Sequence, residues 1–427
     1  MWWRGALFLL RQTVHLFSKD LGRHFLFNSI NLANFISLII LVTMASVLAV
    51  SDTNLVVCKG TCFNIWNGEK HVLVDIPKVK DELDKIIDVS ISSNNKLLAI
   101  MTHSKRLLVY DLNDVTKVKL LTLPRGASKL RFDQKNDHIL VADKTGDVLL
   151  FNINKENDEG VKLFGHLSLL LDILLTEDEQ YVITCDRDEK IRVTCYPNTY
   201  NIQTYCLGHK EFVKHLEFLP HNKSYLTSTS GDGTIKIWDY VTGKLCYSMN
   251  ANDDNDISAE LLNYKNKYGI ETSSLPVTHY CICKISENIS LAAVVISLLN
   301  KVVMFTISDD NGVFKHTLEC ILSLNYYPSA IQFQRKNLHI FNDVSNELEI
   351  YSFVDKNFES ISLTKAIKVF EGREFQSNKN DPLENLLILY KKKIDDIQEY
   401  RQRKLRRLEN GTSKNNSGDM QREFEKK

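Results

Sequence analysis

The sequence lacks the short motifs that mark nucleotide-binding and hydrolytic enzymes. It contains no G-x-x-x-x-G-K-[ST] loop, no H-E-x-x-H, no G-x-S-x-G and no kinase signature. No G-x-G-x-x-G segment follows an expected strand and opens a helix, so a dinucleotide site is not indicated either. A chain without such a constellation is expected to act as an interaction subunit rather than as an enzyme.

The chain also lacks a net charge, because its 53 Lys and Arg residues balance 53 Asp and Glu residues. No global preference for polyanions follows from this balance, so any nucleic-acid contact must be a local patch. The length of 427 residues suffices for one large propeller or for two or three ordinary domains.

No Cys-x-x-Cys motif occurs, and the number of cysteines, nine, is odd. These two features favour a reduced intracellular compartment over a disulfide framework. Two close pairs, Cys58 with Cys62 and Cys281 with Cys283, lack a further His or Cys at zinc spacing. We therefore expect cysteines that are buried in strands, and no metal site.

Residues 1–43 form an apolar N-terminal extension with two interpretations. The run from Phe25 to Ser51 has no charged residue and follows basic residues, as in a signal anchor. Asparagines interrupt the run, and its uninterrupted part is short for a membrane span. Met44 is followed at once by the first expected strand, so our preferred interpretation is an artefact of the gene model. We expect no membrane association unless residues 1–43 are real.

The stretch from Gly208 to Asp239 has the clearest pattern in the chain. Apolar residues alternate with period two between Gly, Pro and Asn turns, which indicates short antiparallel strands. The stretch begins with Gly-His and ends with Trp-Asp, which is typical of a WD40 repeat of roughly 40–45 residues.

Strands similar to the last one of this repeat recur around Trp66, Tyr110, Phe151, Thr194, Trp238, Phe305 and Tyr351. Their successive spacings are 44, 41, 43, 44, 67 and 46 residues. This near-constant period predicts an all-β fold, a seven-bladed WD40 β-propeller over residues 44–370. We expect the N-terminal strand to complete a blade begun near the C-terminal end. The one long spacing predicts a surface insertion at residues 251–274.

WD40 blades contain a buried hydrogen-bonded set that ties their strands together, and the strongest repeat has all of its members. These are His209, Ser228, Asp232 and Trp238. The preceding repeat has the same frame with His166 and Asp188, while Thr194 replaces the tryptophan. We expect these residues to be structural rather than catalytic, because buried polar groups need partners.

The turn at residues 186–190, with the sequence DRDEK, has an unusual composition for a blade. Alignment on the strongest repeat matches Asp188 to Asp232, and charged residues replace both glycines of that repeat's turn. Charged side chains on a tight hairpin form a rigid mount for ion pairing with a partner. The spacing alone leaves open that this is merely a solvated turn.

The region that starts at Gly165 resembles one particular family. It contains the segments GHLSLLLDILLTEDEQYVITCDRDEKIRV, YCLGHKEFV and STSGDGTIKIWDY. They are similar to the WD-repeat, non-catalytic subunit of the tRNA (guanine-N7-)-methyltransferase heterodimer, whose insect members are the wuho proteins. The blade pattern extends the resemblance to most of residues 50–370, whereas residues 1–43 have no counterpart in the family.

The resemblance implies that this chain binds no cofactor and that S-adenosylmethionine belongs to a separate catalytic subunit. That subunit would methylate N7 of the guanine at position 46 of tRNA. The family's partner-binding surface includes the basic residues of the hairpin, which places Arg187 and Lys190 at the interface, with Asp186 and Glu189 as orienting neighbours. The nucleus is the expected location, with the cytoplasm as a second one.

The residues alone, without the resemblance, also allow a different class of function. A WD40 propeller can serve as a general interaction scaffold, such as a ubiquitin-ligase adaptor or a chromatin reader. Such a protein would bind a peptide over the central channel, and changes at Arg187 would then have no effect.

The C-terminal segment predicts an amphipathic, basic helix at residues 381–410. Asp381 and Pro382 are typical of an N-cap and a first helical position, and apolar residues follow at three- and four-residue spacing. We expect the first half to dock on the propeller or on the partner. The second half is expected to face tRNA phosphates through Arg401, Arg403, Lys404, Arg406 and Arg407. Complementarity to the helix dipole is the alternative explanation of these charges. The composition of residues 411–427 predicts a disordered tail.

Overall fold

The computed structural model describes residues 47–68, 70–79, 84–253, 257–268, 270, 272–353, 361–373, 375 and 384–391. The chain divides into two compact units, residues 1–43 and 44–427. The expectations for residues 1–43, for the basic cluster at 401–407 and for the tail at 411–427 lie outside the described residues. No helix among the described residues is long and apolar enough to cross a membrane.

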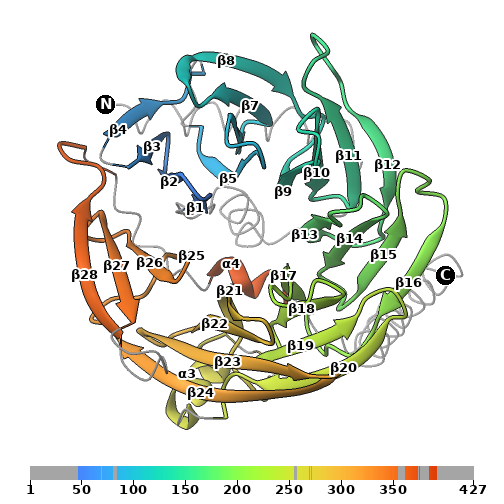
Figure 1. Cartoon of the computed structure of the whole chain (residues 1–427), viewed down its shortest axis with the longest axis vertical. Coiled ribbons are helices and arrows are strands. Elements are labelled where there is room, and N and C mark those ends of the chain that lie inside the picture. The colour runs from blue at the N-terminus through green and yellow to red at the C-terminus, as the bar shows by residue number, and fades with distance from the viewer. Residues whose placement is uncertain are drawn as a thin grey trace, which may run out of the picture. The chain divides into compact units, whose positions relative to one another are not determined.

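The second unit contains seven antiparallel sheets of four strands each, which follow one another around a ring (Figure 1). The strands of blades one to three are β1 (Val47–Val50), β2 (Asn54–Lys59), β3 (Cys62–Asn67), β4 (Lys70–Asp75), β5 (Ile86–Ile91), β6 (Leu97–Thr102), β7 (Arg106–Asp111), β8 (Asp114–Thr122), β9 (Ala127–Phe132), β10 (His138–Asp143), β11 (Asp147–Asn152) and β12 (Val161–Gly165). Those of blades four and five are β13 (Leu170–Leu175), β14 (Tyr181–Asp186), β15 (Ile191–Cys195), β16 (Ile202–Cys206), β17 (Val213–Phe218), β18 (Tyr225–Ser230), β19 (Thr234–Asp239) and β20 (Lys244–Asn250). Those of blades six and seven are β21 (Val277–Ser286), β22 (Ile289–Ile296), β23 (Lys301–Asp310), β24 (Val313–Ser323), β25 (Ala330–Gln334), β26 (Asn337–Asn342), β27 (Glu347–Phe353) and β28 (Ile361–Lys368).

The seven-bladed propeller predicted from the repeat is confirmed. The recurring strands of the sequence are β3, β7, β11, β15, β19, β23 and β27, the third strand of each sheet. The second strand of each blade is buried almost throughout and the third is buried mainly at its centre, least so in β27, whereas the fourth strand is mostly exposed. This gradient explains why the third strand was visible as a repeated apolar segment, because a strand covered on both faces has a near-continuous apolar run.

The expected exchange of the N-terminal strand into the last blade is wrong. Strands β1 to β4 make up one sheet and β25 to β28 make up another, so each blade uses four consecutive strands. Among the described residues, side chains close the ring between these two blades. The amino group of Lys59 donates to Asn346 Oδ1 at 2.6 Å and to the carbonyl of Asp343. Asn64 Nδ2 donates to the carbonyl of Val369 at 2.7 Å.

An apolar cluster lies beneath these polar contacts. Phe370 is 2% exposed and packs with Leu55, Val57 and Leu348, and its ring meets Phe341 edge to face with centroids 6.0 Å apart. The cluster joins residues from the two ends of the propeller sequence. Packing of this kind replaces the strand exchange that the sequence led us to expect.

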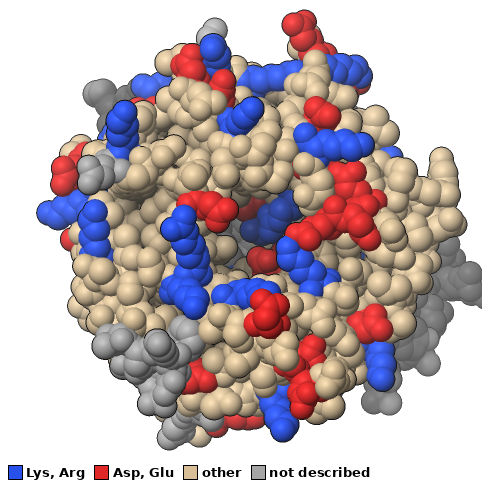
Figure 2. Space-filling model, in the orientation of Figure 1, with Lys and Arg blue, Asp and Glu red and all other residues tan. Residues whose placement is uncertain are grey.

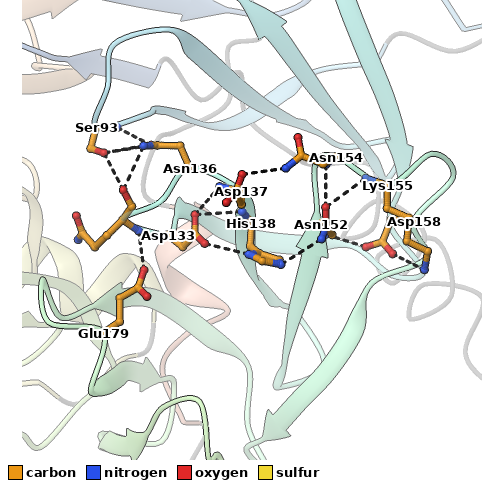
Figure 3. Close-up of polar contacts among 11 residues, drawn as sticks. Ser93, Asp133, Asn136, Asp137, His138, Asn152, Asn154, Lys155, Asp158 and Glu179 are labelled. Atoms are coloured by element: carbon orange, nitrogen blue, oxygen red, sulfur yellow. Dashed lines mark hydrogen bonds and ion pairs between the residues drawn. The ribbon is translucent and has the colours of Figure 1, made fainter.

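Polar turns connect blades two, three and four at the end of the blades where the first strand joins the second (Figure 3). Asp133 Oδ2 lies 3.0 Å from His138 Nδ1 across the β9–β10 turn. Asn136 Oδ1 accepts the backbone N–H of Ser93 from blade two at 2.9 Å. Glu179 Oε1 of blade four accepts another backbone N–H of the same turn at 3.0 Å. The side chains at this end of the blades therefore bond to one another.

The insertion expected at residues 251–274 is partly packed rather than wholly on the surface. It contains α3 (Ser258–Tyr268), which has Glu260 in its first turn and Lys265 and Lys267 in its last, as the helix dipole favours. Tyr264 of this helix is 1% exposed and meets the ring of Tyr390 at a centroid distance of 6.2 Å. The insertion thus contributes to the apolar cluster shared by blades five and six.

We predict that Phe370→Ala lowers the free energy of unfolding by about 3 kcal/mol, because it removes a large buried side chain and leaves a cavity at the ring closure. Val344→Ala is the matched control, since Val344 is 83% exposed. Urea denaturation of the two variants measures the difference. Equal stabilities would mean that this cluster does not close the ring.

Candidate partner-binding hairpin of the fourth blade

The expected hydrogen-bonded set of the fifth blade connects two strands, β18 and β19, the turn between them and the segment that joins β16 to β17. His209 Nδ1 lies 3.2 Å from Asp232 Oδ2, and His209 Nε2 lies 2.8 Å from Ser228 Oγ. The indole N–H of Trp238 donates to the same hydroxyl at 2.8 Å, so this hydroxyl donates to His209. Burial lowers the pKa of His209 and keeps the ring neutral. Each of these buried polar groups has its hydrogen-bond partner within the set, as expected of a structural role and not of a catalytic base.

In the fourth blade the expected role of Asp188 is wrong. His166 Nδ1 pairs with Asp186 Oδ2 at 3.0 Å, and His166 Nε2 lies 2.8 Å from Thr184 Oγ1. The strand register places Asp186 opposite Leu170, as it places Ser230 opposite Val213 in the fifth blade. A carboxylate at this position can reach the histidine, so Asp188 is left on the surface.

The buried carboxylate of Asp186 also holds the turn that follows it. Its Oδ1 accepts the backbone N–H groups of Asp188 at 2.9 Å and of Lys190 at 3.0 Å. Asp186 was expected to lie among the side chains that contact the partner, but it is only 2% exposed. It therefore supports the turn from inside the protein. Glu189 takes up the left-handed conformation, with φ at 66°, as the equivalent Gly233 does at 77°. The turn is rigid because each of these restraints fixes its backbone.

A difference in the neighbouring strand explains why this turn can carry charged side chains. A Cβ atom at Gly231 of the fifth blade would lie 2.4 Å from Phe212, so only glycine fits there. The equivalent pair in the fourth blade is Arg187 and Leu169, which are joined by the same backbone hydrogen bond, at 2.9 Å. The smaller leucine leaves space for a side chain at residue 187.

Four side chains project from this hairpin: Arg187, Asp188, Glu189 and Lys190. Arg187 is 42% exposed along its side chain, its Nε lies 3.9 Å from Asp188 Oδ1, and that nitrogen has no hydrogen-bond partner among the described residues. Lys190 is exposed, and its amino group forms no ion pair within the described part of the chain. Of the two cations that were predicted to meet a partner, Lys190 is therefore unpaired among the described residues, and Arg187 pairs only with Asp188 of its own turn.

Two exposed leucines that were not predicted from the sequence lie beside the hairpin. Leu167 is fully exposed and Leu207 is 62% exposed. The register pairs Ile191 with Cys206, which places Lys190 next to Leu207. Leu167 lies between β12 and β13, two residues before Leu169, whose carbonyl accepts the backbone N–H of Arg187 at 2.9 Å. We name Arg187, Lys190, Leu167 and Leu207 the docking surface; the leucines could have been noticed as apolar residues in expected connections.

The C-terminal segment contacts this region, as expected for its first half. Helix α4 (Glu384–Leu387) ends at Leu387, and residues 388–391 are not helical; the rest of the expected helix, at residues 381–383 and 392–410, lies outside the described residues. The chain turns here because Leu386, Leu389 and Tyr390 all pack into the apolar cluster shared by blades five and six. The hydroxyl of Tyr390 donates to the carbonyl of Gly231 at 3.2 Å. Tertiary packing thus overrides the helical pattern of the sequence.

The charges on the inner strands bind neighbouring blades together. Lys129 pairs with Asp88 at 2.9 Å, and Arg131 pairs with Asp172 at 3.2 Å. Each aspartate also accepts a backbone N–H from the next blade, at 3.0 and 2.9 Å. Around the central hollow of the face shown in Figure 2, Lys and Arg side chains are interspersed with Asp and Glu. These pairings give the inner cations a structural role.

The described residues contain no cluster of His, Cys, Asp or Glu that could hold a metal ion. Cys58, Cys62, Cys281 and Cys283 are buried in strands. Burial raises the pKa of the Cys283 thiol to about 12, so it stays protonated and unreactive.

The fold and the hairpin define a class of protein: a seven-bladed WD40 propeller with a charged turn on its fourth blade. The family model described as the tRNA methyltransferase TRM82 WD40 domain matches residues 154–364. The tRNA (guanine-N(7)-)-methyltransferase non-catalytic subunit wdr4 of Xenopus laevis is 31% identical over 347 residues, which are 79% of this chain and 84% of that protein. The chain belongs to this family of non-catalytic subunits.

Further relatives and solved structures agree. The subunit wuho of Aedes aegypti is 29% identical and covers 79% of this chain and 82% of its own length. The wuho protein of Drosophila melanogaster is 44% identical over 37% of this chain and 38% of its own. A chain of the mitotic checkpoint complex aligns with a TM-score of 0.56 and 14% identity, over 69% of this chain and 82% of that one. At this identity the structural match shows the fold alone.

We predict that Asp186→Asn lowers the free energy of unfolding by about 2 kcal/mol, because a buried carboxylate that accepts three hydrogen bonds is lost. Asp188→Asn changes an exposed side chain two residues away and is expected to stay within about 0.5 kcal/mol. Urea denaturation distinguishes the two. A larger loss for Asp188→Asn would restore the original assignment.

Proposed function

We propose that this chain binds and stabilises a separate catalytic chain that forms N7-methylguanosine at position 46 of tRNA. S-adenosylmethionine is bound by that catalytic chain, and this chain supplies no reacting group. The relatives' shared description as non-catalytic subunits supports the proposal. The observation that carries it is the rigid hairpin that exposes Lys190, which has no ion pair within the described part of the chain, and Arg187, which pairs only with Asp188 of the same turn there.

The geometry of the hairpin suits tight pairing with a partner. Its backbone is fixed by Asp186 before any partner arrives, so little conformational entropy is lost on binding. Arginine presents a planar fork of donors that fits a carboxylate, and lysine adds a mobile point charge. The exposed Leu167 and Leu207 add apolar area beside these charges. A partner surface complementary to this hairpin carries acidic side chains next to an apolar patch.

The C-terminal basic cluster extends the proposal to tRNA. Its five side chains at residues 401–407 lie outside the described residues, and five cations close together in sequence would contact phosphates without reading sequence. The same cluster supports a location in the nucleus, since short basic runs serve as import signals. Presence in the cytoplasm is compatible with this proposal.

We predict that the double variant Arg187→Glu/Lys190→Glu loses heterodimer formation, because it replaces attraction to an acidic partner surface with repulsion. The affinity for the catalytic chain should fall at least about 100-fold, and tRNA methylation by the mixture should fall with it. Calorimetric titration and a methyl-transfer assay measure the two effects.

The matched control is Lys117→Glu/Lys155→Glu, which reverses two exposed lysines of other blades, with side chains 73% and 67% exposed. This control should bind the catalytic chain as the unmodified protein does. If both double variants bind normally and only changes at the central channel matter, the protein is a general scaffold and the proposal fails.

For the tail, we predict that replacing Arg401, Arg403, Lys404, Arg406 and Arg407 with Ala weakens tRNA binding by the heterodimer but leaves its assembly intact. The slope of log affinity against log salt should become shallower by as much as about 4. Without these five cations, fewer tRNA phosphates are neutralised and fewer of their counterions are released on binding. Filter binding at several salt concentrations measures the slope. An unchanged slope would mean that these residues are solvated surface.

A further inference from the structure

The C-terminal segment pairs with the hairpin over a sequence separation of 202 residues. The amino group of Lys391 lies 2.5 Å from Glu189 Oε1 and 4.0 Å from Asp188 Oδ1. The hydrogen bond to Glu189 raises the pKa of Lys391, so this amino group stays charged at neutral pH. Both acidic groups on the surface of the turn are therefore occupied from within the same chain.

This pairing changes the charge that the hairpin presents. The exposed turn has two cations, Arg187 and Lys190, and two anions, Asp188 and Glu189, so by itself it is formally neutral. Lys391 adds a third cation and lies against the anions, which leaves one net positive charge on these five side chains. An approaching acidic surface would otherwise meet the two carboxylates together with the two cations.

Packing fixes the position from which Lys391 reaches the turn. The preceding Tyr390 is 6% exposed, its hydroxyl bonds to the carbonyl of Gly231, and its ring meets Phe212 edge to face at 5.1 Å. Leu386 and Leu389 are buried in the same cluster. An exposed ion pair alone contributes little free energy. Here the neighbouring side chains anchor the backbone, so Lys391 is already in place before a partner binds.

We propose that residues 384–391 are an intramolecular clasp that completes the docking surface. Lys391 is the positioning residue of this clasp, because it masks the carboxylates of Asp188 and Glu189. Arg187 and Lys190 can then pair with acidic side chains of the catalytic chain. This proposal rests on the proposed function. It assigns to the C-terminal segment a role in partner binding that is separate from the tRNA contact of the basic cluster beyond it.

The test is the affinity of the full-length protein for the catalytic chain, measured by calorimetric titration with three variants. Lys391→Glu exposes both carboxylates and adds a third anion, so binding should weaken about tenfold. Lys391→Arg keeps the charge and should bind within about twofold of the unmodified protein. The exchange Glu189→Lys/Lys391→Glu restores the pair with the same net charge and should recover binding to within about threefold.

The controls separate this role from folding and from the proposed function. Lys117→Glu changes a lysine that is 73% exposed in another blade and should bind normally. Urea denaturation should give Lys391→Glu the stability of the unmodified protein, because Lys391 is 47% exposed. Normal binding by Lys391→Glu, together with loss of binding in Arg187→Glu/Lys190→Glu, would refute the clasp alone. Absence of binding by the unmodified protein would refute the proposed function instead.

Discussion

The carboxylate of Asp186 joins the scaffold of the propeller to its candidate interface. One oxygen pairs with the buried ring of His166, and the other accepts two backbone N–H groups of the turn at residues 187–190. The interaction fixes the second strand of the blade, the entry into the blade and the charged turn at the same time. Because the group is buried, any change to it affects both stability and the presentation of Arg187 and Lys190.

In other parts of the molecule, too, single side chains make two stabilising contacts at once. The aspartates of the inner strands neutralise a cation and also accept a backbone N–H from the next blade. Lys59 and Phe370 close the ring without an exchanged strand. The result is a rigid support on which the hairpin and the docked residues 384–391 keep fixed positions. Rigidity of this kind is what a non-catalytic subunit can offer to a partner, since it lowers the entropic cost of association.

The period of the third strands was enough to predict the propeller and to count its blades, because those strands are buried on both faces. The hairpin was visible from its composition. The exchange of roles between Asp186 and Asp188 was not, because both are acidic and only the register of β13 and β14 decides which one reaches His166. The ring closure and the Lys391–Glu189 pair also escaped prediction, since both depend on residues that are far apart in sequence. The end of α4 at Leu387 was missed because tertiary packing overrides a helical pattern there.

Family membership and the hairpin together lead to one central claim: the chain has no methyltransferase activity of its own and acts through a catalytic partner. The most direct measurement is a methyl-transfer assay on tRNA with this chain alone, with the catalytic chain alone and with both together. We predict no N7-methylguanosine with this chain alone, and a clear increase in rate when it is added to the catalytic chain. Methyl transfer by this chain alone, or an unchanged rate on mixing, would contradict the account.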